Sequence, residues 1–373
     1  MERALGTLAR LPSTRLACAT QTYSTTARSH SAYVGGIAAT GKHNVRCLLP
    51  VQKLAGTLDQ ISIEDFRSKA FVPEIPIHIT AAHACSQVSP VLPAASKWFE
   101  LQSSYTNSNA TMRPARGYLS AFGTTTLPYE TTIERGTDDL EAICQALSFG
   151  GEENQRSSLE AFMYDFAEQT NQIHGQGIDA RHTFQFCRFN APLNLFLEAF
   201  GSRNAEAPQI RSLYIAQAQI ADLPKQLQDD LPTPEVVKKV GRGDIYDTSI
   251  WMGIPPTYTP LHKDPNPNLF VQIAGRKIAR LYKPSIGSAI FRNVQTRIGG
   301  SSSSSFRGLE MMQGLEVKIL EEAVWGSSGS IDGYEVEVNP GDALFIPKGW
   351  WHSIKSLNQG TREVNASVNW WFR

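Results

Sequence analysis

The chain has 373 residues with 35 basic and 35 acidic side chains, so its formal net charge at neutral pH is zero. That balance argues against a dedicated nucleic-acid-binding protein, whose phosphate contacts normally need a basic excess. Apolar residues make up 41% and charged residues 19%, which is typical of a globular chain rather than a disordered one. No apolar run is long enough to span a bilayer, and the five scattered cysteines lack a C-x-x-C spacing, so neither a membrane span nor a cysteine-based zinc site is predicted.

Basic residues are concentrated at the start of the chain. Residues 1–58 contain seven of them and one acid, Glu2, and the first 30 residues are rich in Ser, Thr and Ala. This composition is typical of a mitochondrial transit peptide and predicts a mature protein in the mitochondrial matrix. The alternative is a disordered basic tail, with the protein in the cytoplasm or nucleus. We therefore assign residues 1–58 to a transit peptide or disordered segment.

Helical patterns predominate between residues 59 and 204. Ser62 begins a predicted capped helix, and a Pro-punctuated extended segment follows at 71–80. Further helices are predicted near 137–148, 157–172 and 192–200. We expect residues 59–204 to be a helical N-terminal part of the catalytic unit.

Strand patterns predominate after about residue 180. Short apolar or alternating runs bounded by Gly and Pro predict strands at 182–189, 211–217, 246–252, 268–274, 277–283, 343–347 and 366–372. The Gly- and Ser-rich run at 299–305 predicts a flexible loop. Many short strands of this kind favour an antiparallel sandwich or barrel, which we place at residues 205–373. No linker-like stretch separates this barrel from the helical part, so we expect one cooperative unit.

The densest chemical signal runs from Thr259 to Lys277. Side chains alternate faces in an extended chain, so His262 and Asp264 should point the same way and the lysine between them the opposite way. A second histidine, His352, lies far downstream, and pairing of the two strands would bring it beside the first two residues. Two imidazoles and one carboxylate on one face form the facial triad of non-haem Fe(II) sites. The alternative is a surface histidine beside an acidic turn, because an isolated H-x-D pattern is common by chance.

Lys277 follows an apolar strand and a turn. A lysine that reaches into a barrel carries a desolvated charge and needs an anionic partner, which a dicarboxylate co-substrate would supply. The alternative is a solvated hairpin lysine beside Arg276.

These motifs resemble the Jumonji-C domain. The resemblance rests on Thr259, His262-x-Asp264, Asn268, Gly275 and Lys277, followed by Phe345-Ile-Pro, Trp351-His352 and Val368-Asn-Trp-Trp. Within that family the pattern is most similar to the cupin-like protein hydroxylases, such as factor inhibiting HIF and the arginyl hydroxylase branch. The resemblance covers 205–373 well and 60–200 diffusely. It implies a mainly β protein with helices (α+β), built on a double-stranded β-helix, or jelly-roll, core.

The resemblance also implies roles for individual residues. Three would bind Fe(II): His262, Asp264 and His352. Five would hold or orient 2-oxoglutarate, which acts with O2 as co-substrate: Tyr214, Thr259, Asn268, Lys277 and Asn369. The C-terminal tryptophans are expected to pack the barrel rather than take part in the chemistry: Trp350, Trp351, Trp370 and Trp371.

The activity that the resemblance implies is an Fe(II)- and 2-oxoglutarate-dependent dioxygenase that hydroxylates a protein side chain and releases succinate and CO2. Asp264 occupies a ligand position where many histone demethylases carry Glu, which favours hydroxylation over demethylation. Glu130 loosely resembles the acid that holds a substrate guanidinium in the arginyl branch. Gln217 and Gln219 alternate onto one face of the Tyr214 strand, and they are further candidates for substrate contacts.

Two other functions stay open. A hydroxylase of a modified tRNA base or a small molecule would share the fold. A non-catalytic cupin-like binding protein is the third possibility, against which the intact triad and Lys277 argue. We expect a protein substrate, no DNA or membrane partner, and a monomer, while an RNA substrate is not excluded. The span of 75 positions between Lys277 and His352 looks expanded, which leaves the access loops and hence the substrate open.

Overall fold

The computed structural model describes residues 48–80, 92–102, 111–134, 137–148, 153–175, 184–201, 209–299, 312, 314–326, 332–357 and 363–373. The chain divides into two units, Met1–His43 and Asn44–Arg373, and the second contains every described residue. The basic, Ser-rich start of the chain, where a transit peptide is predicted, lies outside the described residues. So does most of the Ser-rich run at 299–305.

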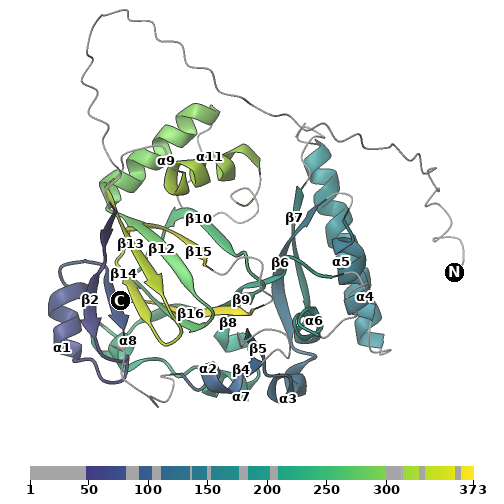
Figure 1. The fold of residues 1–373 in the computed structure, drawn as a ribbon, viewed down its shortest axis with the longest axis horizontal. Coiled ribbons are helices and arrows are strands. Elements are labelled where there is room, and N and C mark those ends of the chain that lie inside the picture. Colours follow the sequence, from purple (N-terminus) through teal and green to yellow (C-terminus); the bar gives the residue numbers. More distant parts are fainter. Residues whose placement is uncertain are drawn as a thin grey trace, which may run out of the picture. The chain divides into compact units, whose positions relative to one another are not determined.

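Two sheets make up the body of the unit 44–373 (Figure 1). Among the described residues, the larger sheet has nine strands in the order β2 (Gln52–Ala55), β3 (Ile77–Thr80), β14 (Ala343–Ile346), β11 (Asn268–Ala274), β16 (Asn365–Phe372), β9 (Ile245–Gly253), β8 (Tyr214–Gln219), β6 (Thr126–Glu134) and β7 (Phe184–Pro192). The smaller has five, in the order β1 (Leu48–Pro50), β13 (Gly333–Val338), β12 (Lys277–Tyr282), β15 (Trp351–Ser356) and β10 (Tyr258–Lys263). A separate ribbon pairs β4 (Phe99–Gln102) with β5 (Thr111–Pro114).

From β9 onward the chain passes back and forth between the sheets. Strands β9, β11, β14 and β16 lie in the larger sheet, and β10, β12, β13 and β15 lie in the smaller one. All pairings among these eight strands are antiparallel. Eight strands arranged in this way form a jelly roll, the double-stranded β-helix. The predicted fold class is therefore confirmed.

Strand β11 shows how the sequence pattern divides the core. All seven of its residues are buried, because sheet and helices cover both faces. Leu269, Val271 and Ile273 join the largest apolar cluster, whereas Phe270 packs between the two sheets with residues of β12 and β14. Side chains alternate along a strand, so Asn268 shares the inner side with Phe270. The interior of the jelly roll therefore receives a polar residue at the start of β11.

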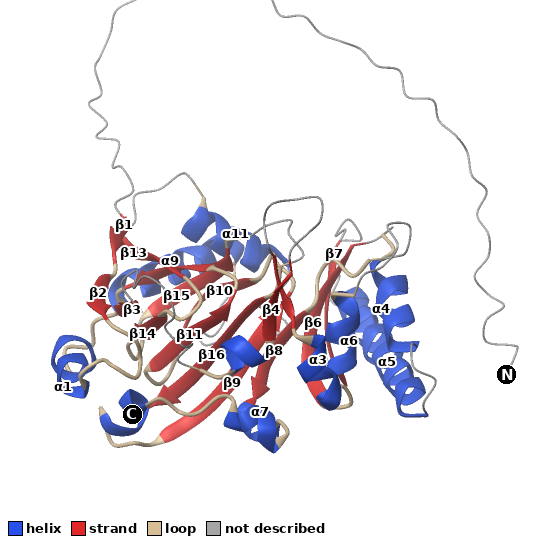
Figure 2. Ribbon diagram, turned by 60° about the horizontal axis from the view of Figure 1, so that its bottom comes forward, coloured by secondary structure: helices blue, strands red, loops and turns tan. Residues whose placement is uncertain are grey.

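Helices cover the outside of the sheets (Figures 1 and 2). The described helices are α1 (Ile63–Phe66), α2 (Ala94–Lys97), α3 (Arg116–Leu119), α4 (Asp139–Ser148), α5 (Glu153–Gly175), α6 (Leu193–Ala199), α7 (Lys225–Asp229), α8 (Glu235–Lys239), α9 (Pro284–Ile298) and α11 (Gly314–Trp325). Helices α9 and α11 pack together on the side of β10, β12 and β15, and α4 and α5 lie beside β6 and β7. No described helix combines the length and apolar character needed to cross a membrane.

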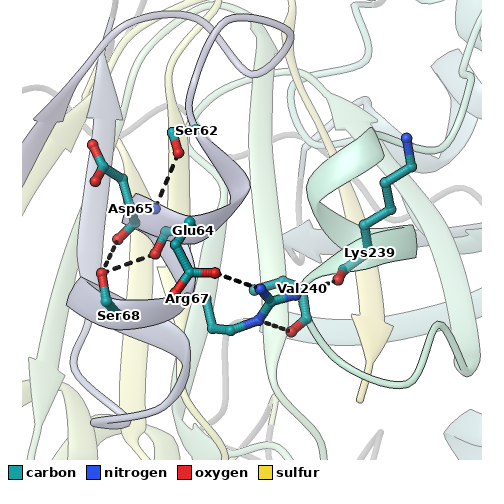
Figure 3. A network of polar contacts seen from close by, with 7 residues as sticks. All are labelled: Ser62, Glu64, Asp65, Arg67, Ser68, Lys239 and Val240. Carbon is teal, nitrogen blue, oxygen red and sulfur yellow. Dashed lines mark hydrogen bonds and ion pairs between the residues drawn. The ribbon is translucent and has the colours of Figure 1, made fainter.

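A network of polar contacts joins the segment around α1 to the end of α8 (Figure 3). Ser62 begins α1 as predicted, because its Oγ accepts a hydrogen bond of 3.2 Å from the backbone N–H of Asp65. Arg67 donates from Nε to the carbonyl of Val240 at 3.0 Å and from Nη2 to that of Lys239 at 2.7 Å. These bonds satisfy carbonyls at the end of α8 that have no partner within the helix.

The boundaries predicted at residues 58 and 204 differ from the structure. Strands β1 and β2 lie inside the predicted 1–58 segment, and they pair in parallel with β13 and β3. Strands β3, β6 and β7 lie inside the predicted helical part and belong to the larger sheet. Short strands such as β1 and β2 have weak local patterns, and their structure comes from distant partners. The predicted helices at 137–148, 157–172 and 192–200 correspond to α4, α5 and α6.

Candidate metal and co-substrate site

Strands β10 and β15 bring the three candidate metal ligands together. Their antiparallel register places His262 opposite His352, and Asp264 follows directly after β10. The Nε2 atoms of His262 and His352 lie 3.7 and 3.6 Å from the two carboxylate oxygens of Asp264. The lysine between the β10 ligands points away, with its Nζ 5.6 Å from the ring of Trp351. The alternation predicted for this segment is confirmed.

Each histidine is held in one tautomer by a backbone carbonyl. The Nδ1 of His262 lies 2.9 Å from the carbonyl of Pro260, and that of His352 lies 3.2 Å from the carbonyl of Trp350. A carbonyl only accepts, so Nδ1 carries a proton, and in the neutral ring Nε2 keeps its lone pair. Burial lowers the pKa of His352 to about 4, which keeps that imidazole neutral at physiological pH. Both rings therefore present a ligand atom toward Asp264.

The carboxylate of Asp264 is buried and held by two N–H donors. Its Oδ2 accepts hydrogen bonds of 2.9 Å from the Nδ2 of Asn268 and 2.9 Å from the indole Nε1 of Trp371. Burial opposes ionisation, but the imidazoles of His352 and His262 and these two donors together hold the pKa of Asp264 below its ordinary value. The carboxylate is thus ionised and fixed in place. Two imidazoles and one carboxylate, with all three ligand atoms within 4.8 Å of one another, fit a divalent metal such as Fe(II).

Lys277 begins β12 and is only 3% exposed. Its Nζ donates to the Oγ of Ser367 at 2.9 Å and to the hydroxyl of Tyr214 at 3.2 Å, and it lies 5.3 Å from the ring of Phe270. Burial lowers the pKa of Lys277 to about 7. Within the described part of the chain, no carboxylate lies within ion-pair distance of this ammonium. The solvated hairpin lysine is therefore ruled out.

The surroundings of Lys277 fit one end of a dicarboxylate. Burial, followed by the charge of Glu130, raises the pKa of Tyr214 above its ordinary value, so its hydroxyl remains protonated. That hydroxyl accepts from Lys277 and still has a proton to donate to an anion. The hydroxyls of Ser367 and Thr259 line the same cavity. An anion here would supply the charge partner that burial of the lysine demands.

One cavity contains the whole predicted set of metal and co-substrate residues. Its empty space, part of which is open to solvent, is about 540 Å³. It is lined by His262, Asp264 and His352 together with Tyr214, Thr259, Asn268, Lys277 and Asn369. Asn369 donates from Nδ2 to the Oδ1 of Asn268 at 2.8 Å, so it helps to orient a neighbour of Asp264. The Oδ1 of Asn369 is buried and has no hydrogen-bond partner among the described residues. It is available to a ligand in the cavity.

Two residues of β16 were missed by the sequence analysis. Trp371 lines the cavity and donates to Asp264, although it was predicted only to pack the barrel. Ser367 lines the cavity and accepts from Lys277. Both lie two residues from Asn369 along the same strand, so period-two alternation from that asparagine was the signal that could have found them.

A β-bulge brings Gln217 into the cavity. The register between β8 and β9 shifts between Ile215 and Ala218, and Gln217 has a φ of 54°. Regular alternation would place Gln217 on the face opposite Tyr214, but the extra residue of the bulge turns it onto the cavity that Tyr214 lines. Gln219 does not line this cavity. Its Nε2 donates to Ser249 at 3.3 Å, and it lines a neighbouring cavity together with Gln217.

Glu130 lies outside the metal cavity. It is 5% exposed and pairs across β6 and β7 with Arg188, whose Nη2 lies 3.5 Å from its Oε1. It lines a separate cavity of about 590 Å³ that also includes Tyr214. Burial raises the pKa of Glu130 to about 7, against the opposing charge of Arg188. The partner of Glu130 is therefore the guanidinium of Arg188 in this chain, whereas the sequence had suggested the guanidinium of a substrate.

A jelly roll with two histidines and a carboxylate facing its interior defines a cupin-type metal-binding protein. Residues 93–373 match the family described as cupin-like domain, and because this span is most of the chain, the protein belongs to the cupin-like, Jumonji-C family. This family uses Fe(II) and 2-oxoglutarate with O2, and the donor set and the buried lysine fit both groups.

Several curated proteins are similar to this chain. Lysine-specific demethylase JMJ30 of Arabidopsis thaliana is 27% identical over 177 residues, which are 48% of this chain and 37% of the relative. Lysine-specific demethylase 8 of Danio rerio is 30% identical over 161 residues, 43% of this chain and 36% of the relative. HSPB1-associated protein 1 homolog of Danio rerio is 32% identical over 160 residues, which are 42% of this chain and 32% of the relative. The chain thus spans only about a third of each relative's length.

Proposed function

We propose that this protein is an Fe(II)- and 2-oxoglutarate-dependent dioxygenase that hydroxylates a protein side chain. One observation carries the proposal: the three candidate metal ligands and Lys277 line the same cavity. Lys277 is buried there, and no carboxylate of the described residues pairs with it. A metal site alone fits many cupins, but a buried ammonium beside it requires an anionic co-substrate. An intact ligand set and Lys277 also argue against a non-catalytic binding protein.

When bound, iron and 2-oxoglutarate supply an oxidative decarboxylation that inserts one oxygen atom of O2 into a C–H bond and releases succinate and CO2. The residues of this chain bind and orient the reactants. Lys277, Tyr214 and Ser367 would hold the distal carboxylate of 2-oxoglutarate, and Asp264 would keep its orientation through Asn268 and Trp371. The rings of Phe270, Trp251 and Trp371 line the cavity and would limit the access of water once the reactants are bound.

Demethylation of a methylated lysine is the second candidate, because two of the similar proteins are named lysine-specific demethylases. Both outcomes begin with hydroxylation of a C–H bond. A hydroxylated N-methyl group loses formaldehyde, whereas a hydroxylated side-chain carbon keeps its oxygen. Asp264 as the carboxylate ligand supports retention of the oxygen.

Mitochondrial location remains a proposal that rests on the composition of the N-terminal segment.

The test is 2-oxoglutarate turnover to succinate by the purified full chain with Fe(II) and ascorbate. We expect metal-dependent turnover that is lost in His262→Ala. In Lys277→Met the affinity for 2-oxoglutarate should fall about 30-fold or more, because a buried charge pair loses one partner. Lys263→Met, which removes a lysine that points away from the cavity, is the matched control and should behave like the unchanged protein.

The pH dependence provides a second readout of Lys277. Only its charged form attracts a dicarboxylate, and burial lowers its pKa to about 7. The affinity for 2-oxoglutarate should therefore weaken as the pH rises above about 7, and Lys277→Met should lose this dependence. If calorimetry under anaerobic conditions detects neither Fe(II) nor 2-oxoglutarate binding to the folded protein, the proposed function is wrong. Formaldehyde released with a methylated substrate would favour demethylation instead.

A further inference from the structure

A second cavity adjoins the candidate metal cavity. Its empty space, part of which is open to solvent, is about 1040 Å³, and it lies where α5 faces strands β6, β7 and β8. Figures 1 and 2 show α5 alongside β6 and β7. Gln217 lines both cavities, so the two meet at this side chain. We call the second cavity the α5 groove.

The α5 groove is lined by both polar and apolar residues, and two of its acidic side chains have no ion-pair partner among the described residues. Asp165 and Glu168 line it from α5, three residues apart and therefore on one side of the helix. Among the described residues neither carboxylate has an ion-pair partner. The cation of the lining is Arg188, which is already paired with the buried Glu130 at 3.5 Å. A ligand that enters the groove thus meets two carboxylates that form no ion pair with a described residue.

The wall that carries these acids is anchored to the sheet. Gln169, next to Glu168, donates from Nε2 to the carbonyl of Arg188 at 2.8 Å and accepts from its backbone N–H at 3.0 Å. These two bonds bind the open edge of β7, the last strand of the larger sheet. Phe162, one turn before Asp165, packs edge-on against Phe189 with ring centroids 4.6 Å apart. The acids therefore stand on a fixed element rather than on a loop.

The junction of the two cavities is built with backbone strain. Gln217 adopts a φ of 54°, a left-handed conformation that L residues other than Asn and Asp rarely take. Such conformations persist where the surrounding structure enforces them, and they are concentrated at binding sites. Its amide forms no hydrogen bond with another described residue. It therefore offers one donor group and one acceptor at the entrance to the metal cavity.

We propose that the α5 groove binds an extended peptide segment of the protein substrate and selects one that carries a Lys or Arg close to the residue entering the metal cavity. The substrate cation would pair with Asp165 and Glu168, and the amide of Gln217 would bind the peptide backbone at the junction. This inference rests on the proposed function and specifies its substrate class. The same carboxylates would repel the phosphates of an RNA.

The test uses the full chain and two fluorescent peptide libraries of random sequence. One library has Lys or Arg fixed near its centre, and the other has Gln there. Fluorescence anisotropy should show about five- to tenfold tighter binding of the basic library by the unchanged protein, as expected for two partly exposed ion pairs. The double variant Asp165→Asn/Glu168→Gln should bind both libraries alike. Glu160→Gln, on the same helix but outside the groove, is the matched control and should keep the preference.

Three outcomes would overturn the inference. They are equal binding of the two libraries by the unchanged protein, a preference that survives in the double variant, and tighter binding of a single-stranded RNA than of the basic library. Added salt should reduce a preference that arises from these ion pairs. Turnover of 2-oxoglutarate without peptide is measured in the same preparation. Its absence counts against the proposed function, whereas normal turnover with unselective peptide binding counts against the α5 groove alone.

Discussion

Trp371 is a residue outside the candidate ligand set that orients one of its members. Its indole N–H and the amide of Asn268 both donate to Oδ2 of Asp264, and the backbone N–H of Gly349 donates to the carbonyl of that aspartate at 3.2 Å. A carboxylate held at both its side chain and its backbone has little freedom to rotate. Positioning residues of this kind are a recurrent part of metal sites and tune metal affinity.

Replacing this indole tests its positioning role. We expect Trp371→Phe to weaken binding of a divalent metal about 10- to 100-fold, because Asp264 loses one of two donors that fix its orientation. Anaerobic titration with Fe(II) would measure the change. Trp98→Phe is a close control, because the Nε1 of Trp98 also donates to a carboxylate, Asp230, at 2.9 Å. Equal metal affinities in the two variants would show that Trp371 acts only in packing.

At the scale of secondary-structure elements, α9 determines where β15 lies. Gly287 of α9 stands against the ring of Trp351, and a Cβ at this position would come within 2.1 Å of Cγ of that ring. Trp351 precedes His352 on β15 and lies opposite Lys263 of β10. The helix therefore packs directly behind one metal ligand. The expanded span between Lys277 and His352, for which the sequence pattern predicted strands and a loop but no helix, contains α9 and α11.

A methyl group at this contact should disturb both stability and the site. Gly287→Ala is expected to lower the free energy of unfolding by about 1–3 kcal/mol, the usual cost of overpacking a core. Metal affinity should fall as well, because Trp351 can only yield by moving β15. Urea denaturation and metal titration provide the two measurements. In Gly117→Ala the new Cβ meets no atom within 4 Å, so that variant should be neutral or slightly more stable. Unfolding of Gly287→Ala at the urea concentration of the parent protein would contradict this packing.

At the scale of the whole molecule, residues 48–62, which precede α1, belong to the folded unit. Strands β1 and β2 extend the two sheets through β13 and β3. Val51 and Leu58, which are 4% and 2% exposed, join the apolar clusters. A chain shortened at residue 58, the boundary predicted from composition, would lose both strands and both side chains.

The two boundaries can be compared directly. A chain of residues 59–373 should be less stable than one of residues 44–373 by at least about 3 kcal/mol, because two buried apolar side chains are lost and two strand edges are uncovered. Thermal unfolding would measure the loss, and light scattering would detect association through the uncovered edges. Coincident unfolding curves for the two chains would place the true boundary after β2.

The strongest predictions from sequence concerned short-range pattern. Alternation in an extended segment placed His262 and Asp264 on one side and Lys263 on the other, and the apolar run at 268–274 predicted β11. Helices α4, α5 and α6 followed from helical periodicity. Strand β6 was missed, because Pro128 and Glu130 interrupt its pattern and its pairing with β7 and β8 decides its structure.

From the sequence by itself, period-two patterns predicted an antiparallel sandwich or barrel and placed His262 and Asp264 on one side of a strand, because these depend on residue type and spacing along the chain. The resemblance to the Jumonji-C domain added the jelly-roll form and the roles of His262, Asp264, His352 and Lys277. Tertiary structure alone decided that Trp371 donates to Asp264, that Arg188 pairs with Glu130, and that β1 and β2 join the sheets. It also decided that Gln217 turns into the cavity through a bulge. Each of these depends on the register between strands that are distant in the chain. Register is set by the packing of the complete core, and a local sequence pattern does not predict it.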